Sequence, residues 1–111
     1  MSRDESYLFD ILDSSRAAIE YVRGKSWEEF SRDGLLQDAV VRRLEIIGEA
    51  AGRVSSAIQK KHPDLPWQAM KGTRNRVIQA YVSIDLDIIW DIVQNDLPSV
   101  VSKLEKIVSS K

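Results

Sequence analysis

The chain has 111 residues, 43% of them hydrophobic, and its 16 basic and 17 acidic residues leave a net charge of −1. This is the length of one domain, and the near-neutral charge excludes an overall basic field, so any contact with nucleic acid requires a local concentration of arginines. The absence of cysteine excludes disulfides, thiolate nucleophiles and cysteine-based metal sites. No apolar run approaches the roughly 20 residues that span a bilayer, and the N-terminus has no signal-peptide pattern. We therefore expect a cytoplasmic protein without membrane contact.

The N-terminal third of the chain predicts two helices. Apolar residues recur at three- and four-residue steps from about residue 4 to residue 23, which predicts an amphipathic helix with Gly24 as its C-terminal cap. Ser26 and Glu29 have the spacing of a capping box and predict a short helix that ends near residue 34.

A second long helix is predicted from about residue 36 to residue 60. Its apolar residues follow at steps of four and three, a rhythm that suits helices packed lengthwise. Gly48 and Gly52 make one stretch thin, and each glycine costs a helix about 1 kcal/mol relative to alanine. Close approach of another helix is the expected compensation, either within the chain or across a dimer contact.

The rest of the chain predicts shorter helices. Two prolines make residues 61–66 a connector, and Gly72 is expected to end a single turn before a third helix that runs to about residue 82. A further helix should break or bend near Asp96-Leu97 because of Pro98, and a last one should follow. No segment alternates with the period of a strand. Residues 1–111 are therefore predicted to form one all-α domain, a small antiparallel bundle of four to five helices.

Polar residues cluster at the predicted third helix. At about 100° per residue, Arg74 and Tyr81 share a face within about 20°, and Asn75 and Gln79 share a second face about 40° apart. Arg74 and Gln79 differ by about 140°, so they converge only if the helix begins after Arg74 or if side chains from two chains meet. The alternative is a simple helix start, in which Arg74 and Asn75 bond to backbone carbonyls.

These residues and their flanks resemble the HepT family of small all-helical HEPN-domain proteins. The mark of that family is an arginine, four variable residues, a histidine, one variable residue and a tyrosine, and Arg74, Gln79 and Tyr81 stand at the three fixed positions. Supporting stretches stand at matching places: Arg43 to Ala50, Pro66-Trp67, Ile84 to Leu86, and Asp96 to Pro98.

The resemblance implies a HEPN-like two-fold homodimer that acts on RNA as a metal-independent endoribonuclease, with a composite site at the dimer interface. It would be the toxin of a type VII-like toxin–antitoxin pair. Arg74 would bind the scissile phosphate, with Asn75 beside it as a catalytic candidate, while the RNA 2′-hydroxyl attacks the adjacent phosphorus. Arg76 and Arg43 are candidates for extending the RNA path.

The resemblance also implies a protein partner. This antitoxin would be an MntA-type minimal nucleotidyltransferase that transfers AMP from ATP onto Tyr81, and no metal or other cofactor would be required. The added phosphate and base would occupy the face that holds Arg74 and repel RNA.

The chain departs from the family pattern at Gln79, where the family has the proton-transferring histidine. Glutamine does not titrate near neutral pH, and general acid–base catalysis contributes about 10²–10⁴-fold, so an impaired enzyme is expected. Two explanations fit: a deliberate substitution that allows a toxic nuclease to be produced, or a natural member with reduced or different activity. His62 is not a ready substitute, because it precedes two prolines in the connector. The alternative functions are a non-catalytic interaction protein that binds, and is modified by, a nucleotidyltransferase, and a plain helical dimerisation module.

Overall fold

The computed structural model describes residues 2–83 and 85–109, and leaves out the side chains of residues 81–83 and 109. Within this part there is no strand, which confirms the predicted all-α class. In the described ranges the bundle consists of four long helical stretches and two short helices: α1 (Arg3–Tyr21), α2 (Trp27–Ser31), α3 (Gly34–Arg53), α4 (Ser56–Lys61), α5 (Trp67–Ser83), and a last stretch made of α6 (Leu86–Asp91), the π-helical η1 (Ile92–Asp96) and α7 (Leu97–Ser109).

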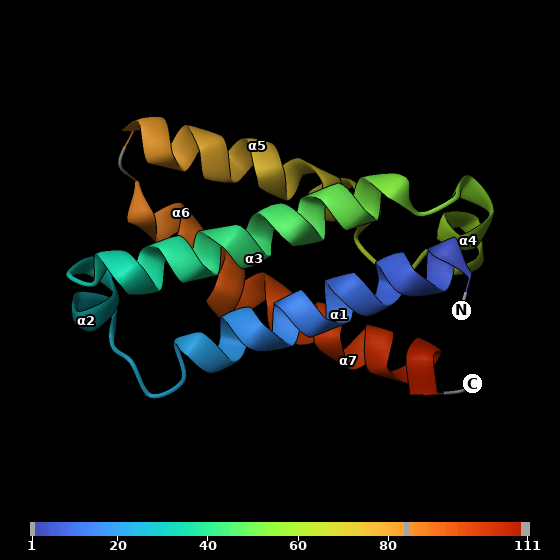
Figure 1. The fold of residues 1–111 in the computed structure, drawn as a ribbon, viewed down its shortest axis with the longest axis horizontal. Helices are drawn as coiled ribbons and strands as arrows, with labels where there is room; N and C mark the ends of the chain where they lie inside the picture. The colour runs from blue at the N-terminus through green and yellow to red at the C-terminus, as the bar shows by residue number, and fades with distance from the viewer. Residues whose placement is uncertain (1, 84, 110–111) are drawn as a thin grey trace.

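The long helices run antiparallel to their neighbours. α3 packs between α1 and α5, and α1 also packs against α7 (Figure 1). α1 begins and α7 ends at the same end of the bundle (Figure 1). α5 therefore lies at one edge, with α3 beneath it and one side of the helix turned away from the bundle.

The core is apolar and closed by an aromatic cluster. Its largest fully buried side chains include Phe30, Ile11, Leu44, Ile47, Ile89, Ile92 and Leu104. Phe30 has no exposed surface, and its ring centroid lies 5.2 Å from that of Trp90 and 6.1 Å from that of Trp27. These contacts attach α2 and α6 to the bundle, since aromatic pairs at such separations add to the free energy of burial.

The predicted capping box is confirmed. The Ser26 hydroxyl accepts from the Glu29 N–H at 3.1 Å, and the Glu29 carboxylate accepts from the Ser26 N–H at 3.0 Å. The backbone hydrogen bond from Ser26 lowers the pKa of Glu29. α1 ends at Tyr21, slightly earlier than expected, with Val22 rather than Gly24 as its cap. Gly24 lies in the following turn at φ 73°, a conformation that favours glycine.

The prediction of one helix over residues 36–60 is wrong. α3 ends at Arg53, and Val54 is extended at φ −65° and ψ 136° with its side chain buried. The Asp4 carboxylate accepts from the Ser55 N–H at 2.8 Å and from the Ser55 hydroxyl at 2.7 Å. Ser55 also caps α4. The break is thus stabilised by a carboxylate from α1, which no local pattern around residue 54 indicates.

The predicted interruption at Gly72 is also wrong. Gly72 lies inside α5, which runs without a break from Trp67. The break or bend predicted near Pro98 takes the form of an irregular turn: the π-helical η1 ends at Asp96, α7 begins at Leu97, and Pro98 is the second residue of α7. In the π-helical turn the Leu97 N–H donates to the carbonyl of Ile92, five residues earlier. This wider turn relieves the clash that a proline ring makes in a regular helix.

Candidate functional site

The polar cluster lies along the open side of α5. The buried side of this helix consists of Trp67, Met70, Thr73, Val77 and Ala80. Among the described side chains of α5, the exposed ones are Gln68 and Ala69 near its start and Arg74, Asn75, Ile78 and Gln79 further along. Ile78 is 49% exposed, which leaves an apolar side chain beside the polar residues.

Arg74 stands where the backbone of α5 comes close to Gly48 of α3. A Cβ atom placed on Gly48 of α3 would lie 3.2 Å from the Arg74 Cβ, 3.2 Å from its backbone nitrogen and 3.4 Å from the Met70 carbonyl oxygen. Gly48 is buried in this contact. The sequence left two explanations for the glycines of α3: packing within the chain or a dimer contact. At Gly48 the close approach is within the chain. A Cβ on Gly52, in contrast, would have no atom within 4 Å.

The three candidate arginines have different surroundings. The Arg76 Nη1 lies 3.3 Å from the Asp96 carboxylate of η1. The Arg43 Nε donates to the Tyr21 hydroxyl at 3.2 Å, and its guanidinium lies over the Tyr21 ring and 3.7 Å from Asp13.

Arg74 differs from both. Its side chain is exposed, and within the described part of the chain its guanidinium has no ion pair or hydrogen bond. Arg76 is about 200° around α5 from Arg74, so the structure does not bring the two together. Arg43 contacts α1 rather than α5. Arg74 is thus the candidate arginine with free donors for an anionic ligand.

The position of Arg74 in α5 decides a question that the sequence left open. Since the helix begins at Trp67, Arg74 lies well inside it, and a helix start after Arg74 is excluded. The Arg74 and Gln79 side chains leave the same helix about 140° apart and about 7.5 Å apart along its axis. Asn75 and Gln79 are both exposed. Tyr81 belongs to α5, but its side chain lies outside the described residues.

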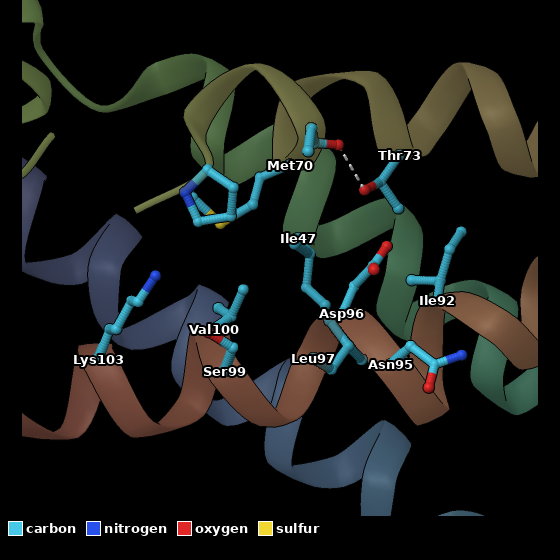
Figure 2. Close-up of a pocket in the computed structure, with 12 residues that line it drawn as sticks. Ile47, Met70, Thr73, Ile92, Asn95, Asp96, Leu97, Ser99, Val100 and Lys103 are labelled. Atoms are coloured by element: carbon cyan, nitrogen blue, oxygen red, sulfur yellow. Dashed lines mark hydrogen bonds between the residues drawn. The ribbon is translucent and has the colours of Figure 1, made fainter. Parts of the chain in front are cut away.

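A cleft of about 270 Å³ lies on the other flank of α5, against η1 and α7 (Figure 2). Three polar side chains of its lining are already paired. The Thr73 hydroxyl donates to a carbonyl of its own helix at 2.9 Å (dashed in Figure 2), Asp96 pairs with Arg76, and Lys103 donates to the Asp64 carbonyl at 2.7 Å. The sequence did not indicate this cleft, because its lining comes from segments far apart in the chain. Its satisfied polar groups make it a weaker candidate for an anionic ligand than the surface around Arg74.

His62 lies in the connector between α4 and α5. The His62 carbonyl accepts from the Trp67 indole N–H at 2.8 Å, in the connector before α5. Among the described residues, no three His, Cys, Asp or Glu side chains are grouped so that they could hold a metal ion. None of the described helices is long and apolar enough to cross a membrane.

Comparison with known proteins identifies similar sequences. The model of a family described as ribonuclease HepT-like matches residues 11–107. A Thermococcus cleftensis protein named as a probable ribonuclease HepT is 37% identical over 93% of this chain and 94% of its own length. A Methanocaldococcus jannaschii protein named as a candidate RNase is 37% identical over 91% of this chain and 93% of its own length. A third, from Caldanaerobacter subterraneus and named likewise, is 33% identical over 100% of this chain and 99% of its own length. No solved structure matches the chain significantly.

Proposed function

The chain belongs to the HepT-like ribonuclease family, and from this premise we propose that it is the toxin of a toxin–antitoxin pair, built as an endoribonuclease and impaired at Gln79. The observation that carries the proposal is Arg74, an exposed arginine whose guanidinium is unpaired in the described part of the chain. A guanidinium stays charged at every physiological pH and presents forked donors that suit phosphate oxygens. Its role is to bind the scissile phosphate of RNA.

The proposed reaction needs no metal. The RNA 2′-hydroxyl loses its proton and attacks the adjacent phosphorus, and the bond to the 5′-oxygen of the next nucleotide breaks. The products are a 2′,3′-cyclic phosphate and a 5′-hydroxyl, the latter protonated as it leaves. One group must accept the first proton and one must supply the second. Gln79 can do neither, which is the reason for the impaired rate.

We place the complete site between two copies of the chain. Within one protomer the Arg74 and Gln79 side chains diverge by about 140°. A two-fold axis along α5 more readily brings Arg74 of one copy and residue 79 of the other to the same phosphate. Ile78 supports this arrangement, since its 49% exposed side chain lies between them in sequence and gives the interface an apolar contact. Asn75 lies on the same open side as Gln79, and can hydrogen-bond to RNA or to the partner copy.

Regulation is proposed to occur at the same surface. Tyr81 follows Arg74 by two helical turns, so the two residues leave α5 within about 20° of each other. An MntA-type minimal nucleotidyltransferase would transfer AMP from ATP to the Tyr81 hydroxyl, releasing pyrophosphate. The transferred phosphate carries a negative charge to the face of Arg74 and competes there with RNA.

The test is cleavage of a mixed RNA in the presence of EDTA. We expect the Gln79→His variant to cut faster than the chain as given, and Arg74→Ala in that background to abolish the gain. Arg76→Ala is the matched control, because it removes an arginine two residues away that faces Asp96 instead. A Gln79→His protein that cuts equally well without Arg74 refutes the assigned role. If no variant cuts while Tyr81 is still labelled, the chain is a binding partner of the transferase and not a ribonuclease.

A further inference from the structure

Gly48 of α3 lies directly against the backbone of α5 at Arg74. α5 crosses α3 so that one turn of α5, from Met70 to Arg74, rests on the glycine. The nearest atoms to a Cβ placed there are the Cβ and the backbone nitrogen of Arg74, both at 3.2 Å. These atoms carry the base of the arginine side chain and cannot move aside as the tip of a long side chain can.

We propose that Gly48 is a positioning residue, which sets the place of the Arg74 guanidinium by letting α5 rest directly on α3. This inference rests on the proposed function, because it concerns the arginine assigned to the scissile phosphate. A methyl group at position 48 requires the α5 backbone to move by a few tenths of an ångström at Arg74. The exposed guanidinium, at the end of a long side chain, moves with it.

The cost of this glycine supports a specific role. A glycine inside a helix is about 1 kcal/mol less favourable than alanine, and α3 contains a second one, Gly52, one turn later. A Cβ on Gly52 would have no atom within 4 Å. The two glycines thus share a helix, but only Gly48 touches Arg74. Gly52→Ala is therefore the matched control.

The experiment compares Gly48→Ala and Gly52→Ala in the Gln79→His background, at a temperature where circular dichroism shows both fully folded. Gly48→Ala should lower kcat about three- to tenfold with a smaller change in KM, because small errors in the placement of a catalytic group reduce the rate of the chemical step. Gly52→Ala should leave both constants unchanged. A purely structural role would lower the folded fraction without separating kcat from KM.

A second readout does not need activity. The arginine Nε–Hε signals in ¹⁵N NMR spectra report the surroundings of each guanidinium, and Gly48→Ala should shift the Arg74 signal while the Arg76 signal stays in place. If the Gln79→His parent shows no Arg74-dependent cleavage, the proposed function fails. The NMR signal of Arg74 then decides by itself whether Gly48 sets the place of the Arg74 guanidinium. An Arg74 signal unchanged by Gly48→Ala, or a kcat equal to that of Gly52→Ala, overturns the inference.

Discussion

The divergence of Arg74 and Gln79 along α5 leads to a prediction about mixed dimers. The perturbation uses two chains: one carries both Arg74→Ala and Gln79→His, and the other is the chain as given. Neither has an arginine and a histidine together. If one site takes its arginine from one protomer and its proton-transfer group from the other, a mixed dimer has one intact site, formed by the arginine of one chain and the new imidazole of its partner.

The magnitude follows from the symmetry. Random exchange at equal concentrations makes about half of the dimers mixed, and each of these has one intact site out of two. The mixture should therefore reach about a quarter of the activity of the Gln79→His homodimer. The chain as given, which lacks the proton-transfer group, should by itself lose about 10²–10⁴-fold. The separation of about 7.5 Å along α5 and about 140° around it is the structural reason to expect sites shared between protomers.

The assay is RNA cleavage in EDTA, with subunit exchange confirmed by native mass spectrometry. A mixture in which both chains carry Arg74→Ala is the control, since it exchanges in the same way and contains no phosphate-binding arginine. An exchanged mixture no more active than the sum of its separate chains refutes the reasoning, and shows that one protomer supplies both groups to a site.

Three further predictions concern modification, the fold and its pH dependence. Tyr81→Phe should abolish transfer of label from ATP by the partner nucleotidyltransferase, and equal labelling of that variant would contradict the assignment. Phe30→Ala should cost about 3–5 kcal/mol in urea unfolding followed by tryptophan fluorescence, because the side chain is fully buried, whereas Phe9→Ala, at a site 46% exposed, should cost about 0.5 kcal/mol or less. The Ser55 hydroxyl, and then its backbone N–H, lower the pKa of Asp4 below its ordinary 3.8, so this contact stabilises the fold above about pH 3.8 and is lost as the pH falls through the lowered pKa. The difference in Tm between the chain and Asp4→Asn should therefore be present at pH 7 and shrink below pH 3.8, and a difference that does not change with pH would contradict this.

The sequence determined the features that depend on neighbours a few residues apart. Apolar periodicity predicted the all-α bundle, and the Ser26–Glu29 spacing predicted the capping box, because helix period and cap geometry are set within one or two turns. The spacing of Arg74 and Tyr81, together with the supporting stretches around them, indicated the family from the sequence as well. Their relative directions on a helix could also be calculated from the sequence.

Only the tertiary structure decided where the helices stop and which side chains are free. The end of α3 depends on Asp4, which lies 51 residues before its partner Ser55, and the pairing of Arg76 depends on Asp96, 20 residues later. That the Arg74 guanidinium has no partner among the described residues, and that its backbone lies against Gly48, follows from how α5 packs across α3. Such contacts join segments that are distant in the chain, and their geometry is fixed by packing the whole core, so no local pattern in the sequence contains them.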